Sequence, residues 1–113
     1  MALKKEIELD NGVIVNYHRI VSLNKITNIS NIVEIASYSS ENKREEEAEY
    51  QRVQKKKYNN EELTKQEQEL LDKGINVFVN TEFIQKEYNE KENIKDAYEY
   101  LKTLEKYEKA ENV

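Results

Sequence analysis

The sequence has no cysteine and only one histidine, His18. Without cysteine, disulfide bonds and thiolate nucleophiles are excluded, and one imidazole cannot supply the ligand cluster of a zinc site. A serine nucleophile would have to rely on His18 as its base. His18 falls within a strand pattern, opposite the side of Val15 and Tyr17, where we expect a partly exposed structural residue. We therefore expect no catalytic residue, no metal and no cofactor, and the chain is interpreted as a protein that is not an enzyme.

Proline is absent, and glycine occurs only as Gly12 and Gly74. A glycine-rich phosphate loop needs glycines close together and a lysine at a fixed spacing, so nucleotide binding of that kind is excluded. An EF-hand is excluded as well, because no alternating acidic ligands follow Asp10 and Asn11. Residues 1–10 alternate polar and apolar side chains, whereas a signal peptide or membrane helix needs a continuous apolar stretch. We expect no small-molecule substrate and no membrane partner.

Charged residues make up 36% of the chain and apolar residues 37%. This is more charge and less apolar content than in an average soluble domain, so the 113 residues are expected to form one domain with a small core. Small cores are commonly completed by oligomerisation. The net charge of −5 repels phosphate backbones, and the basic run Lys55–Lys57 beside Arg52 is surrounded by glutamates. We therefore expect protein partners, including further copies of the chain, and no nucleic acid.

Four strands are predicted from alternating polar and apolar residues. They occupy about residues 3–38 and 75–84 and are separated by stretches rich in asparagine, aspartate and serine. In the last strand, Val79, Thr81 and Phe83 are expected to share the apolar side. This number of strands is sufficient for a small antiparallel sheet.

Two irregularities are predicted in the first pair of strands. The pair Asn11–Gly12 tolerates positive φ values and favours a type I′ hairpin turn. The returning strand changes the phase of its apolar residues, which predicts a β-bulge near His18 and Arg19.

A charged insertion follows the third strand and covers residues 39–74. In its second half, Thr64 and Glu67 have the spacing of a capping box and Gly74 suits a left-handed C-cap, so a helix is predicted between them. The first half, residues 40–57, fits two alternatives, a solvated helix or a partly mobile excursion.

A C-terminal amphipathic helix is predicted over about residues 93–109. Its apolar residues recur at the three- and four-residue spacing of a helix, at Ile94, Ala97, Tyr98, Leu101 and Leu104. The fold class that follows is α+β, mainly β. We expect a small antiparallel sheet or β-sandwich with a charged helical insertion and a C-terminal helix, in a single domain of residues 1–113.

Tyrosine is the abundant aromatic residue, with eight copies and no tryptophan. Tyrosine is enriched at protein interfaces because its ring buries area while its hydroxyl keeps a hydrogen bond. Tyr100 and Tyr107 flank the apolar side of the predicted C-terminal helix, and Tyr88 precedes it. We expect these three residues to contact protein partners.

Both ends of the chain resemble a known group of proteins. The segments are ALKKEIELDNGVIVNYHRIVSLNKITN at 2–28 and INVFVNTEFIQKEYNEKENIKDAYEYLKT at 75–103, within which residues 12–20 and 97–102 fit the group's pattern. They resemble small tail or baseplate proteins encoded by phages and prophages of low-GC Gram-positive bacteria. The resemblance does not extend to the charged insertion.

This resemblance implies a β-sandwich-like fold similar to the N-terminal shoulder domain of lactococcal phage receptor-binding proteins, which assemble as symmetric oligomers. It also implies a structural role in the virion tail, after synthesis in the cytoplasm of the host bacterium. The implied partners are other phage tail proteins and further copies of the chain. The alternative hypothesis is a phage-encoded regulatory protein that binds a host protein through the charged insertion.

Overall fold

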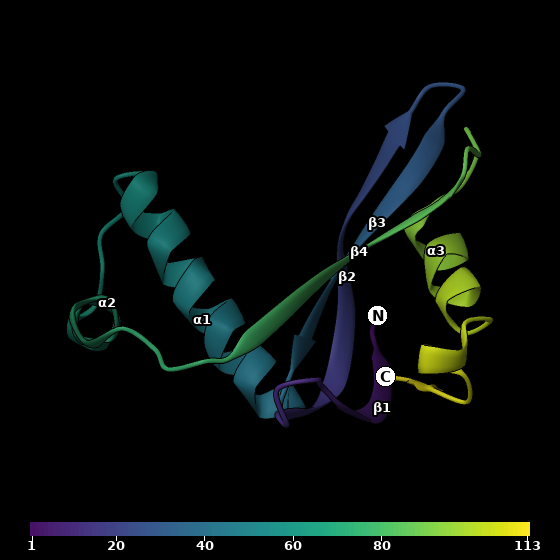
Figure 1. Cartoon of the computed structure of the whole chain (residues 1–113). Coiled ribbons are helices and arrows are strands. Elements are labelled where there is room, and N and C mark those ends of the chain that lie inside the picture. Colours follow the sequence, from purple (N-terminus) through teal and green to yellow (C-terminus); the bar gives the residue numbers. More distant parts are fainter.

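The computed structural model describes every residue from Met1 to Val113 (Figure 1). Its elements in chain order are β1 (Leu3–Glu8), β2 (Ile14–Ile26), β3 (Ser30–Tyr38), α1 (Glu41–Tyr58), α2 (Lys65–Lys73), β4 (Val79–Glu87), α3 (Ile94–Leu101), the 3₁₀ turn η1 (Glu105–Tyr107) and β5 (Glu111–Asn112). The strands form one antiparallel sheet in the order β4-β3-β2-β1-β5. The predicted α+β class is confirmed. Of the two predicted alternatives, a small antiparallel sheet and a β-sandwich, the structure has the single sheet, with 34% of the residues in helices and 35% in strands.

The hairpin between β1 and β2 does not contain the predicted type I′ turn. Gly12 has a φ of 84°, but Asn11 is not among the residues with positive φ. The amide of Gly12 donates to the carbonyl of Leu9 at 2.8 Å, and the amide of Leu9 donates to the carbonyl of Val13 at 2.8 Å. The loop is therefore longer than a two-residue turn and has one left-handed residue. Asn11 instead accepts a hydrogen bond from the amide of Val13 through its side chain at 3.1 Å.

A β-bulge in β2 decides which of its residues face the core. The pairing of β2 with β3 shifts between Ile20 and Ser22, which places the bulge at Val21. Because the extra residue reverses the alternation, Ile20 and Leu23 both pack against the core. The predicted bulge is therefore present, but it lies beyond His18 and Arg19. The regular alternation still holds up to Ile20, which lies on the same side of β2 as His18.

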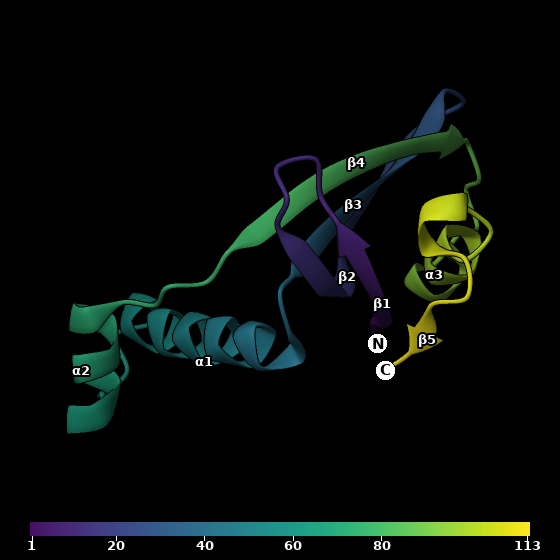
Figure 2. The ribbon, with the colours of Figure 1, turned by 60° about the horizontal axis from the view of Figure 1, so that its bottom comes forward.

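The core lies on one face of the sheet, beneath α3 and the C-terminal segment (Figure 2). The buried residues that form it come from both layers: Leu3, Ile20, Val33, Ile35, Ala97, Tyr98, Leu101 and Tyr107. The sheet contributes alternate residues of its strands, and α3 contributes one amphipathic stripe. The other face of the sheet has no comparable layer over most of its area, except where α1 begins.

The C-terminal helix is shorter than the predicted range of 93–109. It ends at Leu101, where the amides of Thr103 and Leu104 donate to the carbonyls three residues earlier, each at 3.0 Å, in tighter 3₁₀-type turns. The chain then reverses and places Tyr107 in the core, and β5 pairs with β1. This fifth strand was not predicted, because two residues carry no alternation pattern.

Strand β4 begins at Val79, later than the predicted residue 75, and it pairs with β3 over its whole length. Its two sides are the reverse of those predicted. Ile84 packs against the core, while Phe83 is 66% exposed on the open face. Because alternation alone does not say which side is covered, the prediction for Phe83 is wrong.

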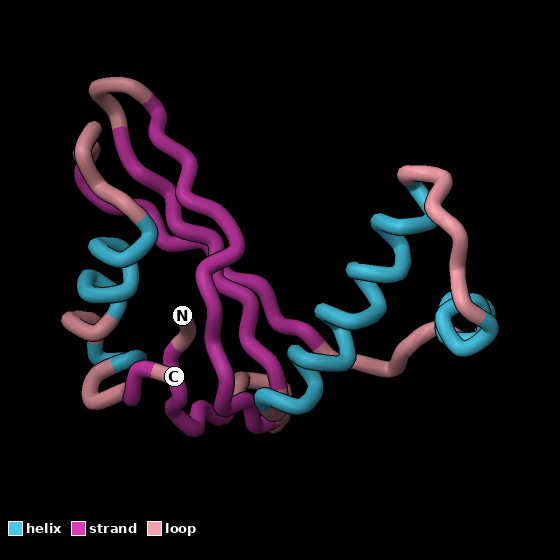
Figure 3. The backbone as a smooth tube through the Cα atoms, turned by 180° about the vertical axis from the view of Figure 1, so that it is seen from behind, coloured by secondary structure: helices cyan, strands magenta, loops and turns pink.

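The charged insertion forms an arm of two helices, α1 and α2, that stands away from the sheet (Figure 3). Residues 40–57, for which the sequence left two alternatives, are helical, and Ser40 caps α1 by accepting from the amide of Lys43 at 3.3 Å. The radius of gyration is 16.4 Å, whereas a compact chain of this length has about 13 Å. The protein is therefore elongated.

Candidate functional site

His18 is the only imidazole, and the structure buries it almost completely, with 1% of its surface exposed. Its Nε2 lies 2.7 Å from the carbonyl oxygen of Lys5, so this nitrogen carries the proton and donates. The other nitrogen, Nδ1, then accepts from the hydroxyl of Ser37 at 2.7 Å. The expectation of partial exposure is wrong because His18 shares the covered side of β2 with Ile20 and is packed edge-on against Tyr107, with ring centroids 5.4 Å apart.

The pair of Ser37 and His18 has the donor and acceptor order of a nucleophile and its base. Ser37 is only 5% exposed, however, and no pocket in the structure includes either residue. The ring of Tyr107 packs against His18, and its hydroxyl lies near Ser37. Burial also lowers the pKa of His18, which favours the neutral form of the ring. The geometry fits a structural hydrogen-bond chain.

Tyr107 was expected at a protein interface, and the structure places it in the core with 0% exposed surface. Tyr107 is not part of a helix that continues from α3, because α3 ends at Leu101. The 3₁₀ turn η1 directs Tyr107 toward the core. Burial raises the pKa of its hydroxyl, which lies near Ser37 and Glu82 without a hydrogen bond of good geometry to either. Within this chain Tyr107 is a core residue, so its prediction as an interface residue is corrected.

Tyr88 and Tyr100, the other two predicted interface residues, are half-buried and lie together. They line one shallow groove of about 540 Å³ at the end of β4. The ammonium group of Lys86 lies 4.5 Å above the centre of the Tyr100 ring and also pairs with Glu92. The structure therefore brings these two tyrosines together around Lys86, away from Tyr107.

Inward-facing charges of β4 are neutralised by the segments packed beneath them. Lys86 pairs with Glu92, which is 3% exposed and also accepts from the side-chain amide of Asn31 at 2.7 Å. Glu82 pairs with Lys106 in the C-terminal segment. A charge that faces the covered side of a sheet is tolerated when it is paired in this way. These pairs explain why the polar side of β4 faces inward.

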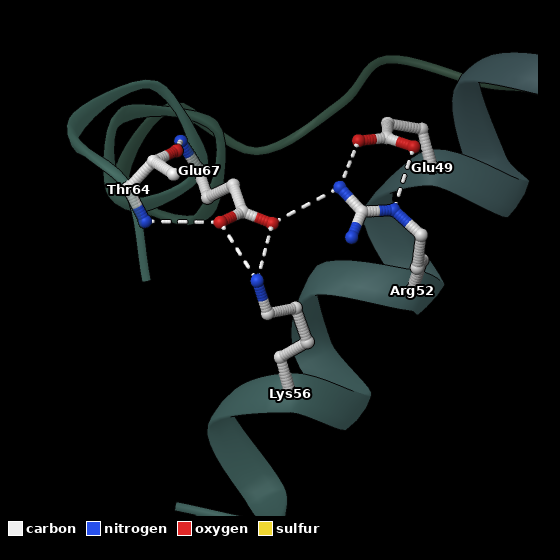
Figure 4. A network of polar contacts seen from close by, with 5 residues as sticks. All are labelled: Glu49, Arg52, Lys56, Thr64 and Glu67. Atoms are coloured by element: carbon white, nitrogen blue, oxygen red, sulfur yellow. Dashed lines mark hydrogen bonds and ion pairs between the residues drawn. The ribbon is translucent and has the colours of Figure 1, made fainter. Parts of the chain in front are cut away.

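The polar contacts between α1 and α2 meet at one carboxylate, that of Glu67 at the start of α2 (Figure 4). Glu67 accepts from the backbone amide of Thr64 at 2.9 Å, in the predicted capping box, and from Lys56 at 3.0 Å. Arg52 reaches it at 3.0 Å and also pairs with Glu49 at 2.6 Å. The Thr64 amide, followed by Lys56, lowers the pKa of Glu67 to about 2. This network sets the position of α2 relative to α1.

The same network affects the basic stretch of α1. Arg52 and Lys56 both direct their charges at Glu67, so these two cations belong to an ion-pair network within the arm. Next to this network, beyond Glu49, α1 and residues 70–76 border an open groove of about 640 Å³, lined by both acidic and basic side chains. The arm thus presents mixed charge, as a solvated or protein-binding surface does.

The open face of the sheet and the outer edge of β4 are the uncovered surfaces of the main body. Tyr38, 1% exposed at one end of this face, donates to Glu47 of α1 at 2.7 Å, so α1 covers that end. Further along the face, Val21 and Phe83 are exposed, and Ser22 donates to Glu34 at 2.9 Å. The alternation of β4 was visible in the sequence. What no sequence signal gave was the position of β4 at the sheet edge.

No helix of the structure combines the length and the apolar composition needed to cross a bilayer. Comparison with protein-family models, with curated proteins and with solved structures found no match to this chain.

Proposed function

We propose that this chain is a structural or assembly component of a phage or prophage tail that acts through contacts with other tail proteins and carries out no catalysis. The observation that carries the proposal is its elongated shape: the radius of gyration is 16.4 Å, and beyond the first turns of α1 the arm extends away from the sheet. A chain that works alone usually closes around its core. A chain built into an assembly leaves surface for its neighbours.

The small, one-sided core supports the same proposal. Only 19 of 113 residues are buried, and the core cluster lies between one face of the sheet and α3. The opposite face keeps Phe83 and Val21 exposed. Small cores of this kind are commonly completed by association with a partner. The sequence resemblance to phage tail proteins indicates which partners to test first.

The polar cluster around His18 supports a role without catalysis. Its serine and histidine are buried, and their hydrogen bonds are made within the fold. An enzyme would need this pair to be accessible to substrate. If an activity is nevertheless found, its loss in His18→Ala without loss of the fold would assign it to this cluster.

The test is co-expression of the tagged chain with phage tail proteins, followed by pull-down and light scattering. We expect a stable complex with at least one tail protein and incorporation into particles. A clean monomer at high concentration that binds none of these proteins contradicts the proposal.

The alternative function, a phage-encoded regulator that binds a host protein, is favoured by one observation. The arm is rigidly built through Glu67 and has its own groove of about 640 Å³, so it can serve as a separate binding surface. Because Tyr38 and Val79 are paired in the sheet, residues 39–78 can be replaced by a short Asn-Gly turn. Loss of host-protein capture with particle assembly intact favours the regulator, and the converse favours the tail component.

A further inference from the structure

We propose that the outer edge of β4 pairs with β4 of a second copy of this chain. The two strands would run antiparallel about a two-fold axis and join the two sheets into one. The inference deepens the proposed function by naming the surface used between copies, and it rests on the assembly role proposed above. The proposed partner of the β4 edge is a second copy of this chain, and no other protein.

The first argument is that β4 is an open edge. In the sheet order β4-β3-β2-β1-β5, β4 pairs only with β3, and no element lies along its outer side (Figure 2). It has nine residues, so every second backbone amide and carbonyl along it points away from β3 with no partner strand. At the opposite edge β5 has only two residues, too few to receive a strand. The sheet therefore offers one long edge for pairing.

The second argument is that β4 lacks the usual devices that protect an edge. The chain has no proline, and β4 has no glycine and no shift in register against β3. Inward-facing charges commonly discourage strand addition. In β4 these are Glu82 and Lys86, and each is already neutralised within the chain, by Lys106 and by Glu92. The backbone of β4 is thus regular, and its inward charges do not repel an arriving strand.

The third argument is the match of β4 with itself. A two-fold axis through Phe83 places the two Phe83 rings side by side on the open face, where each is 66% exposed in the single chain. The other directly opposed residues are Val79 with Glu87, Asn80 with Lys86, Thr81 with Gln85, and Glu82 with Ile84. No two like charges face each other in this register. Axes through Glu82 or Lys86 would oppose like charges and are disfavoured.

An axis through Ile84 also avoids like charges, because it sets Glu82 against Lys86 of the second copy. Both of those charges already have partners within their own chain, so this register adds little. It also faces each Phe83 ring with Gln85 and leaves the rings only diagonal to each other. Aromatic pairs directly across two strands are more favourable than this arrangement, so we favour the axis through Phe83.

The absence of cysteine allows a direct test by cross-linking. A single Phe83→Cys substitution on this exposed site introduces the only thiol of the chain. Directly opposed residues of antiparallel strands lie within the Cα separation that a disulfide accepts. The matched control is Tyr58→Cys, which is 86% exposed at the far end of α1. We expect rapid formation of a covalent dimer by Phe83→Cys on mild oxidation, and much slower formation by the control.

A second test needs no cross-link. Light scattering over a concentration series should show a reversible dimer for the unmodified chain. Phe83→Lys places two ammonium groups opposite each other and should weaken the dimer roughly tenfold or more, while Tyr58→Lys should leave it unchanged. Circular dichroism confirms that both variants keep the fold, as expected for exposed positions.

A monomer at every concentration, or a dimer that Phe83→Lys does not weaken, overturns the pairing through β4. Equal cross-linking rates for the two cysteine variants overturn it as well. The proposed function is assessed separately, by pull-down with tail proteins. If Phe83→Lys still dimerises and still captures a tail protein, the edge assignment is wrong and the tail role stands.

Discussion

Removal of one hydroxyl, that of Tyr98, tests how α3 is joined to the sheet. Its Oη accepts from the amide of Ile20 at 2.8 Å and donates to the carbonyl of Met1 at 2.9 Å. Tyr98→Phe keeps the ring in the core but leaves the buried amide of Ile20, next to the bulge, without an acceptor. An unsatisfied buried donor costs about 1–3 kcal/mol, so we expect the free energy of unfolding to fall by about 2 kcal/mol. Domains are stable by about 5–15 kcal/mol, so this loss is a substantial share.

The measurement is urea unfolding followed by circular dichroism, with Tyr58→Phe as the control because Tyr58 is 86% exposed. The thermal midpoint of Tyr98→Phe should also fall, by roughly 8 °C. Surface substitutions usually change stability by less than about 0.5 kcal/mol, and the control should fall within that range. If the stability of Tyr98→Phe also changes by less than about 0.5 kcal/mol, the Tyr98 hydroxyl does not stabilise the junction of α3 with the sheet. The inference that the Ile20 amide needs this acceptor is then wrong.

Three further predictions concern pH, the arm and the core. Because burial lowers the pKa of His18 below the ordinary 6.5, the folded state binds its proton less readily than the unfolded state. The contribution of His18 to the free energy of unfolding should be complete above about pH 6.5. It should decline as the pH falls below that value, by at most about 1.4 kcal/mol per pH unit. Urea midpoints of the unmodified chain and of His18→Gln, compared over this pH range, check this. Glu67, with its pKa lowered from 4.5 to about 2, should stabilise the arm at neutral pH and lose this effect only as the pH falls from 4.5 towards 2. Glu67→Gln should therefore speed tryptic cleavage of α1 at neutral pH, while Glu69→Gln on the same helix should not. Leu101→Ala should cost about 2–5 kcal/mol in urea unfolding, against little for the exposed Ile94→Ala, and equal losses would contradict the assigned core.

Local signals in the sequence predicted local structure well. The capping box of Thr64 and Glu67 is present at the start of α2, and Gly74 has a positive φ of 73°, although its ψ of −170° lies outside the predicted left-handed helical conformation. The phase change in β2 predicted a bulge, which lies at Val21. These features depend on neighbours within a few residues, so the chain itself carries the information.

The orientation of β4 could not be predicted in the same way. Alternation places Phe83 and Ile84 on opposite sides but does not say which side is covered. The structure turns Ile84 inward together with Glu82 and Lys86, because Lys106 and Glu92 are there to pair with them. Lys106 follows Glu82 by 24 positions and Glu92 follows Lys86 by 6, and no local pattern links them. From alternation alone Glu82 and Lys86 would be placed on the solvent side, whereas their partners Lys106 and Glu92 hold them on the inner side.

The candidate interface residues divide for a related reason. Tyr88 and Tyr100 lie at the surface groove around Lys86, whereas Tyr107 is in the core. Helical periodicity grouped Tyr100 with Tyr107 on the assumption that the helix continues. Two 3₁₀-type hydrogen bonds after Leu101 end that periodicity, and neither proline nor glycine marks the place. A helix end without a breaker residue depends on tertiary packing, here on the space that Tyr107 fills above His18.

The inward position of the charges in β4 also connects the core to the proposed pairing. If Phe83 were inside, the edge would present Glu82 and Lys86 on its open side, and a second copy would meet charges that have to be desolvated. With the charges turned inward and paired, the open side of the edge carries Phe83 between Thr81 and Gln85, all exposed. These three central residues are uncharged and lose little hydration in the pairing, and the one charge on the open side, Glu87, faces Val79 of the second copy. The packing that made the orientation of β4 unpredictable is thus the same packing that leaves its edge suited to a second copy.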